Sequence, residues 1–162
     1  MIRLKDIIAP PFYTVHNDIK VGKHTHYFLK GGRGSTKSSF VSIEIILGMM
    51  GDADANAMAI RKVGVNLKDS VFEQLEWAIN KLGVDGYWRG RKSPLELVYI
   101  PTGQRIIFRG ADNPKKIKST KFSKGYCKYI WYEEAAEFDG MEEIRTINQS
   151  LIRGGGRFCV FY

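Results

Sequence analysis

Short apolar runs alternate along the chain with longer stretches in which apolar residues recur every three or four positions. The short runs indicate buried strands, and the longer stretches indicate helices that pack against them. Alternating strands and helices predict an α/β fold with a mostly parallel sheet flanked by helices. We expect strands at residues 27–30, 57–63, 95–100, 105–108, 127–132 and 157–162, and helices at residues 37–50, 71–82 and 141–152.

Two of these segments carry clear local signals. The stretch at residues 71–82 is amphipathic, with Ser70 and Glu73 placed to form a capping box and Gly83 placed to end the helix. Residues 101–104, Pro-Thr-Gly-Gln, suit a turn between two strand-like runs. The sequence therefore predicts an antiparallel hairpin inserted into the sheet.

Composition narrows the class of protein. The 162 residues fit one domain, and the 44% hydrophobic and 26% charged content is that of an ordinary globular chain. No apolar stretch is long enough to cross a bilayer, and the N-terminus lacks the pattern of a secretory signal. The two cysteines, Cys127 and Cys159, lie in apolar runs, so we expect reduced core thiols in a cytosolic protein.

The charge of the chain points to a polyanionic partner. The net charge is +8, and residues 109–128 hold seven basic side chains against one acid, Asp112. The segment from Lys115 to Lys128 could contact DNA phosphates or the nucleotide of a neighbouring subunit. A solvated loop or short helix explains the same composition equally well.

Residues 31–38, Gly-Gly-Arg-Gly-Ser-Thr-Lys-Ser, form a candidate P-loop (Walker A) between a predicted strand and a predicted helix. Glycines let backbone N–H groups face phosphate oxygens, and the helix N-terminus favours the same anion. Lys37 can reach the β- and γ-phosphates, and Ser38 can offer its hydroxyl to Mg²⁺. Thr36 stands where the second signature glycine is usual, which requires a negative φ there. The alternative is a glycine-rich turn without a ligand.

The predicted strand at residues 127–132 runs directly into Glu133 and Glu134, as in a Walker B element. Such a strand delivers carboxylates to the C-terminal edge of the sheet, where ligands of α/β proteins bind. We assign Glu133 to the metal and Glu134 to the attacking water. The alternative is that these acids, with Glu137, only complement a helix N-terminus at Ala135.

The segments Leu-Lys-Gly-Gly-Arg-Gly-Ser-Thr-Lys-Ser-Ser and Ile-Trp-Tyr-Glu-Glu-Ala-Ala-Glu-Phe resemble motifs of the large terminase subunit of tailed phages, in particular its PBSX-like family. The threonine variant of the loop is typical of that group. The resemblance implies a P-loop NTPase of the additional-strand catalytic-glutamate type that binds ATP and Mg²⁺. It also implies a motor that packages double-stranded DNA into a capsid in the bacterial host cytoplasm. Implied partners are a portal protein, a small terminase subunit and further copies in a homo-oligomeric ring, with no membrane.

The same resemblance assigns roles to single residues. Arg33 would sense or stabilise the γ-phosphate, although a solvent-facing loop cation is the alternative. Arg109 is a candidate for an arginine finger that acts on a neighbouring subunit, but no local motif fixes it. Phe12 and Tyr13 lie where relatives often hold the adenine base, and both could equally be core residues. The residues expected to contact the nucleotide are Gly31, Gly32, Arg33, Gly34, Ser35, Thr36, Lys37, Ser38 and Ser39.

Full-length relatives would continue beyond Tyr162 with a coupling motif and an RNase H-like nuclease domain. We therefore expect residues 1–162 to be an ATPase domain truncated before its last core strands, without nuclease activity. Two alternatives stay open from the sequence. One is a prophage remnant that binds nucleotide without productive turnover, and the other is a different P-loop DNA translocase or helicase-like ATPase.

Overall fold

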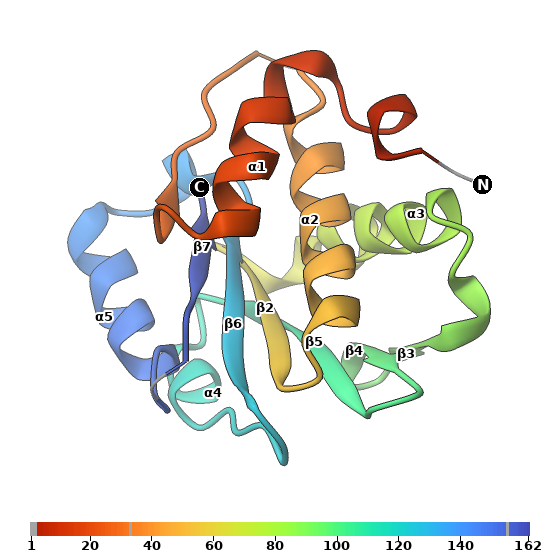
Figure 1. Cartoon of the computed structure of the whole chain (residues 1–162). Helices are drawn as coiled ribbons and strands as arrows, with labels where there is room; N and C mark the ends of the chain where they lie inside the picture. Colours follow the sequence, from red (N-terminus) through yellow and green to blue (C-terminus); the bar gives the residue numbers. More distant parts are fainter. Residues whose placement is uncertain (1–2, 33, 155) are drawn as a thin grey trace.

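A computed structural model describes residues 3–32, 34–154 and 156–162. Within these ranges the chain builds one seven-stranded sheet with the order β1-β7-β6-β2-β5-β4-β3 (Figure 1). The strands are His26–Tyr27 (β1), Ala55–Arg61 (β2), Trp88–Lys92 (β3), Leu95–Tyr99 (β4), Gln104–Gly110 (β5), Tyr126–Tyr132 (β6) and Cys159–Phe161 (β7).

The sheet is parallel from β1 to β5 and antiparallel at the β4 and β3 edge. The predicted mostly parallel sheet and its inserted hairpin are thus confirmed. The edge strand β3 was not predicted, because four of its five residues are exposed and it shows no apolar alternation. The segment becomes a strand because its main chain pairs with β4, and not because of its own hydrophobic pattern.

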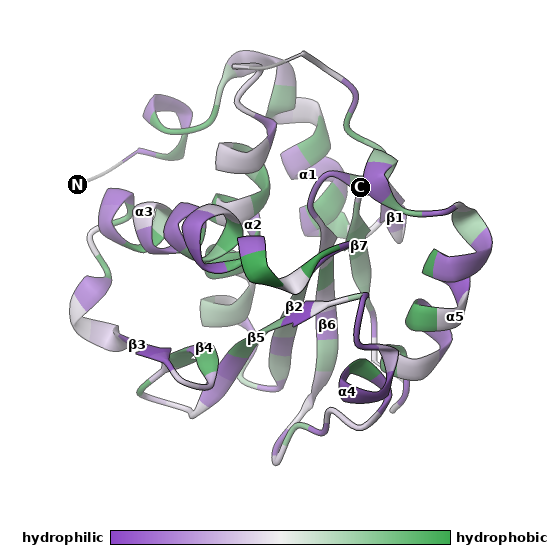
Figure 2. Cartoon of the chain, turned by 180° about the vertical axis from the view of Figure 1, so that it is seen from behind, coloured by the Kyte–Doolittle hydropathy of each residue, from purple (hydrophilic) through white to green (hydrophobic). Residues whose placement is uncertain are grey.

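Helices cover both faces of the sheet (Figures 1 and 2). The α-helices are Tyr13–Val21 (α1), Lys37–Gly51 (α2), Glu73–Lys81 (α3), Pro114–Lys118 (α4) and Met141–Leu151 (α5). A π-helical turn covers Lys68–Phe72, and single 3₁₀ turns lie at Leu4–Asp6, Pro10–Phe12, Gly64–Asn66, Asp85–Tyr87 and Ala135–Glu137. No helix within the described ranges is both long enough and apolar enough to cross a membrane.

Two apolar cores lie on opposite faces of the central strands. Ala57 and Ala59 of β2 belong to the core shared with α2 and α3, whereas Met58 and Ile60 belong to the core shared with α4 and α5. This alternation follows from the period of two along a strand. Most of α2 is buried because the helix lies directly against the sheet, which explains why its apolar positions occur nearly all round.

The amphipathic helix differs from its prediction at the N-terminus. It begins earlier, with the π-helical turn Lys68–Phe72, and α3 follows without a break in the chain direction. The Ser70 hydroxyl donates to the Asn66 carbonyl oxygen at 2.6 Å, so the predicted capping box with Glu73 is wrong. Gly83 ends the helix as predicted, with φ of 66° and an N–H that donates to Asn80.

The strand predicted at residues 27–30 is shorter than expected. Regular pairing ends at Tyr27, although the Leu29 N–H still donates to the Tyr162 carbonyl oxygen at 3.0 Å. The chain then leaves the sheet for the glycine-rich segment. The short strand β1 therefore fixes the start of that segment beside β7.

Both cysteines are free and buried, as expected. Burial raises the pKa of the Cys127 thiol and of the Cys159 thiol to about 12. These thiols therefore stay protonated at neutral pH and act as small apolar core groups.

Candidate functional site

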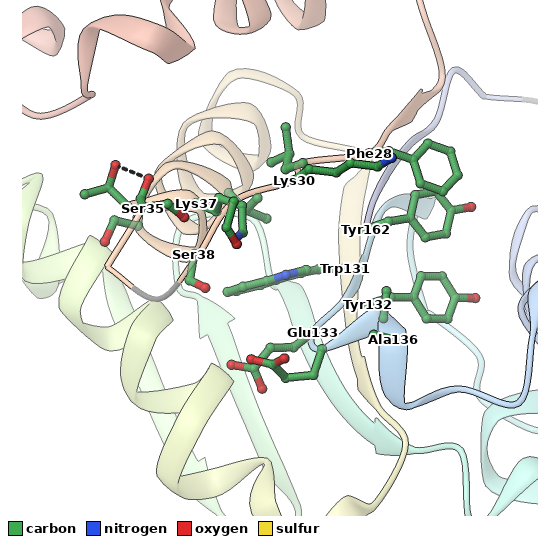
Figure 3. A pocket seen from close by; sticks show the side chains of 18 of the residues that line it. Phe28, Lys30, Ser35, Lys37, Ser38, Trp131, Tyr132, Glu133, Ala136 and Tyr162 are labelled. Atoms are coloured by element: carbon green, nitrogen blue, oxygen red, sulfur yellow. Dashed lines mark hydrogen bonds between the residues drawn. The ribbon is translucent and has the colours of Figure 1, made fainter.

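A single cleft brings together the two segments that the sequence singled out (Figure 3). It has a volume of about 1110 Å³ and lies where β1, β6 and β2 end and α2 begins. From the loop side it is lined by Gly31, Gly32, Gly34, Ser35, Thr36, Lys37, Ser38 and Ser39, and from the β6 side by Trp131, Tyr132, Glu133, Glu134, Ala135 and Ala136. Arg33 lies outside the described residues, so its predicted contact stays a prediction.

Lys37 and Ser38 are the first two residues of α2, so the N-terminus of this helix opens into the cleft. The Lys37 ammonium donates to the Gly31 carbonyl oxygen across the loop. A Cβ built on Gly31 would lie 2.9 Å from Ser35 Oγ and 3.3 Å from Lys37 Nζ. Glycine at position 31 thus allows the lysine to lie against the main chain of the loop.

Thr36 does not have the negative φ that the sequence analysis required. It has φ of 60° and ψ of 12°, and it is the N-cap residue of α2. Its hydroxyl donates to the Ser35 carbonyl oxygen at 2.7 Å (Figure 3). A left-handed backbone costs a residue with a Cβ roughly 1–2 kcal/mol, so the loop is strained at this position.

Glu133 follows β6 directly, and its N–H donates to the Ile60 carbonyl oxygen at 3.0 Å. Burial raises the pKa of its carboxyl group, and the nearby Ser70 hydroxyl and Arg61 guanidinium act in the opposite direction. Its Oε2 atom is buried and accepts no hydrogen bond within the described part of the chain. Because an unsatisfied buried oxygen is costly, a water molecule or a cation bound there would stabilise it.

Glu134 is exposed and takes φ of 52°, in the turn that leads from the end of β6 into Ala135–Glu137. That segment is only one 3₁₀ turn, and no side chain caps it. The alternative that these acids stabilise a helix N-terminus therefore gains no support from the geometry. Both glutamates line the cleft instead.

Arg61 is a member of the site that the sequence analysis missed. It ends β2, lines the cleft, and places Nη1 3.5 Å from Glu133 Oε2 and Nη2 3.4 Å from Glu137 Oε1. The available signal was the predicted strand at residues 57–63. A parallel neighbour of β6 must end at the same edge, and a basic residue there can reach the acids.

Ser38 and Glu133 could hold a magnesium ion. Hydroxyl and carboxylate oxygens are suitable ligands, and Mg²⁺ is commonly held by one or two carboxylates together with phosphate oxygens and water. The unsatisfied Glu133 Oε2 fits this requirement. The described residues hold no group of three or more His, Cys, Asp and Glu side chains that could bind a metal without a phosphate ligand.

The structure places Phe12 and Tyr13 away from the cleft, so the adenine contact considered for them stays a prediction without support from the geometry. Phe12 stacks on Phe40 of α2 with ring centroids 4.5 Å apart, and the Tyr13 hydroxyl donates to the Lys5 carbonyl oxygen. Neither residue lines the cleft. The aromatic side chains that do line it near β1 are Phe28 and Tyr162, which stack at 4.2 Å (Figure 3).

Arg109 lies on β5 and does not line the cleft. Its guanidinium donates to the Phe108 carbonyl oxygen at 2.9 Å and to the Thr120 hydroxyl at 3.3 Å. A role as an arginine finger toward a neighbouring subunit stays a prediction. The basic segment after it forms α4 and a loop, with exposed lysines at positions 115, 116 and 118.

One cleft combines a strand, a glycine-rich loop that leads into Lys-Ser at a helix N-terminus, and a second strand that is followed by two acidic residues. This combination defines a P-loop nucleotide-binding domain. The family model described as "Phage terminase large subunit" matches residues 23–160. The chain therefore belongs to the phage terminase large subunit family.

Two curated proteins are similar in sequence. The large terminase subunit of Bacillus phage SPP1 is 44% identical over 165 residues, which cover 99% of this chain and 39% of that protein. The PBSX phage terminase large subunit of Bacillus subtilis (strain 168) is 35% identical, over 75% of this chain and 27% of that protein. The chain thus spans well under half the length of these relatives.

Solved structures show the same fold at low sequence identity. The large terminase of the thermophilic bacteriophage D6E matches with a TM-score of 0.65 and 11% identity, over 87% of this chain and 34% of that one. The ATPase domain of the Thermus phage P74-26 large terminase matches at 0.59 and 14%, over 94% and 68%. The N-terminal domain of the bacteriophage phi29 DNA packaging ATPase matches at 0.64 and 12%, over 97% and 78%.

Proposed function

We propose that this chain is the ATP-binding and ATP-hydrolysing motor domain of a phage terminase large subunit, which drives packaging of double-stranded DNA. The observation that carries the proposal is the cleft itself, where Lys37 and Ser38 of α2 face Glu133 and Glu134 after β6. A D6E large terminase of the same fold has been solved in complex with ADP, which supports a nucleotide as the ligand.

The loop and the start of α2 would bind the phosphates. Backbone N–H groups of residues 34–38 would face the phosphate oxygens, and the N-terminus of α2 would add a positive partial charge. Lys37 would exchange its present acceptor, the Gly31 carbonyl oxygen, for phosphate oxygens. Ser38 and Glu133 would hold Mg²⁺, which neutralises charge on the phosphate oxygens when bound.

Hydrolysis would proceed by in-line attack of water on the γ-phosphate. Glu134 orients this water and accepts its proton, while the bond to the leaving ADP oxygen breaks. Lys37 and Arg33 stabilise the charge of the transferred group. Glu134 suits this role because it lies in the turn after β6, lines the cleft and is exposed.

The wider assignment rests on family membership and charge. The net charge of +8 favours a partner rich in phosphate, and contacts to phosphates alone suit a motor that is indifferent to DNA sequence. We extend the proposal to a homo-oligomeric ring that works in the host cytoplasm with a portal protein and a small terminase subunit. Arg109 is a candidate for the contact between neighbours in that ring.

Phosphate release with and without Mg²⁺ tests the proposal. We expect the parent chain to release phosphate from ATP only with Mg²⁺, and expect Lys37→Ala and Glu134→Gln to release almost none. A parent that binds ATP but releases no more phosphate than Lys37→Ala would contradict the enzymatic function. Hydrolysis that double-stranded DNA never accelerates would remove the support for a DNA motor.

A further inference from the structure

Two adjacent cations at the end of β2 hold the segment that follows β6. Arg61 is the last residue of β2 and Lys62 follows it, but their side chains reach different acids. Arg61 contacts the acids at the start of the segment, and Lys62 contacts those further on. The turn that carries Glu134 is thus fixed from one neighbouring strand.

Arg61 is the inner of these two cations. Its side chain is 17% exposed and lies between Glu133, at 3.5 Å, and Glu137, at 3.4 Å. Within the described residues its buried Nε atom has no hydrogen-bond partner, and neither has Glu133 Oε2. The two charged groups are therefore close and largely buried, but Arg61 Nε and Glu133 Oε2 each lack a hydrogen bond.

Lys62 is the outer cation and faces away from the cleft. Its Nζ lies 2.7 Å from Asp139 Oδ2 and 2.9 Å from Glu143 Oε1. Glu143 also accepts the N–H of Asp139 at 2.9 Å. Lys62 does not line the cleft. The two cations therefore differ in the one property that matters for the site, contact with Glu133.

We propose that Arg61 is the counter-ion of Glu133 when no metal is bound, and that it competes with the divalent cation for this carboxylate. The inference rests on the proposed nucleotide and metal site. Two cations that share one half-buried carboxylate repel each other, because screening is weak there. Glu137 offers the guanidinium a second carboxylate, so Arg61 stays paired when Glu133 turns to the metal. Arg61 is thus a positioning residue.

A magnesium titration of ADP binding tests this competition. The fluorescence of a labelled ADP at fixed concentration is followed while Mg²⁺ is added to the parent, Arg61→Gln, Arg61→Lys and Lys62→Gln. We expect Arg61→Gln to lower the half-saturating Mg²⁺ concentration about fivefold, since the competing charge is gone. Arg61→Lys keeps the positive charge beside Glu133, so its half-saturating Mg²⁺ concentration should stay within about twofold of the parent.

Lys62→Gln is the matched control. It removes the cation at the adjacent position, which also contacts the segment after β6. That cation does not contact Glu133. We expect its half-saturating Mg²⁺ concentration to stay within about twofold of the parent, even if its melting temperature falls. A merely structural role of Arg61 would lower the melting temperature in both variants without this difference in Mg²⁺ dependence.

Three results would overturn the inference. The first is a half-saturating Mg²⁺ concentration that is unchanged or raised in Arg61→Gln, and the second is a decrease of the same size in Lys62→Gln. The third is a half-saturating Mg²⁺ concentration in Arg61→Lys that differs from that of the parent by more than about twofold. A parent that shows no Mg²⁺-dependent ADP binding would instead contradict the proposed function, and the inference with it.

If Arg61→Gln does not fold, Glu137→Gln gives the test in the opposite direction. It removes the second partner of the guanidinium and leaves Arg61 to Glu133 alone, so the half-saturating Mg²⁺ concentration should rise about twofold. A decrease in Glu137→Gln would contradict the competition.

Discussion

The two segments that meet in the cleft are held in different ways. The loop before α2 is held mainly by contacts within itself, such as those of Ser35 N–H with Gly32 and of Lys37 with Gly31. The turn after β6 is held by cations of another strand, Arg61 and Lys62. The loop can thus exchange its internal contacts for contacts with a ligand, whereas the turn is fixed before any ligand arrives.

From this difference we expect the loop to determine mainly the affinity for nucleotide and the turn to determine mainly the rate of hydrolysis. We call this the division between affinity and rate. Internal contacts of the loop are lost when phosphate binds, so changes there should act first on affinity. The turn carries a preset carboxylate, so changes there should act first on rate. Four variants follow in order of decreasing expected effect: the first two test this division, and the last two test how the loop and α2 are stabilised.

Glu134→Gln should have the largest effect. We expect the rate of ATP hydrolysis to fall about 10²–10³-fold, because the amide cannot accept the proton of the attacking water. Steady-state phosphate release measures the rate, and a labelled nucleotide measures affinity, which should change less than about threefold. Glu142→Gln, on the exposed face of α5, is the control. Equal losses of rate and affinity in Glu134→Gln would break the proposed division.

Lys37→Ala should act on affinity. Loss of a charge-assisted contact to phosphate is expected to weaken ADP binding about 30–100-fold. Calorimetric titration with ADP and Mg²⁺ measures this loss, and the thermal unfolding of the variant without nucleotide should resemble that of the parent. A variant that binds ADP as tightly as the parent would mean that the loop does not grip phosphate through this lysine.

Thr36→Gly should stabilise the fold slightly. The relief of a left-handed threonine, roughly 1–2 kcal/mol, exceeds the entropic cost of glycine, roughly 0.5–1 kcal/mol. We expect the free energy of unfolding to rise by about 0.5–1 kcal/mol in a urea titration. Thr36→Ala keeps the Cβ and should bring no gain. A gain of equal size in Thr36→Ala would show that the backbone is not the source of strain.

The smallest effect concerns the support of α2 by α1. His16 Nδ1 lies 2.5 Å from Glu44 Oε1, and burial raises the pKa of the Glu44 carboxyl group against the opposing effect of His16. Because the folded state binds this proton more readily, stability should fall as pH rises from the ordinary glutamate pKa through the raised one. Glu44→Gln should flatten that decline by an amount on the order of 0.5 kcal/mol.

Urea titrations of the parent and of Glu44→Gln at several pH values measure this difference. Glu142→Gln, at an exposed position, should follow the parent at every pH. The same pH dependence of stability in the parent and in Glu44→Gln would contradict the assigned direction for Glu44.

The sequence predicted correctly those elements whose structure depends on residues close together in the chain. Glycines followed by Lys37 and Ser38 fixed the loop and the start of α2, and the apolar run before Glu133 fixed β6 and its end. These features depend only on residues near one another in the chain. The same holds for the Pro-Thr-Gly-Gln turn and for Gly83.

Features that depend on distant pairing were missed or wrong. Arg61 meets Glu133 because β2 and β6 are parallel neighbours, and because a register shift after Asn56 sets Ile60 beside Tyr132. The edge strand β3 exists because β4 pairs with it, not because of its own pattern. Ser70 was assigned to a cap because the π-helical turn before α3 has no sequence signature, and the φ of Thr36 depends on how the loop closes.

The two buried thiols make the chain a convenient subject for spectroscopic probes. Cys127 and Cys159 are buried, and burial raises the pKa of both thiols to about 12, so we expect neither to react with maleimides at neutral pH. A cysteine introduced at an exposed position, such as Glu142→Cys, would therefore be labelled selectively without removal of the native ones. A fluorophore there would report on the segment that follows the turn carrying Glu134 while nucleotide and metal are added.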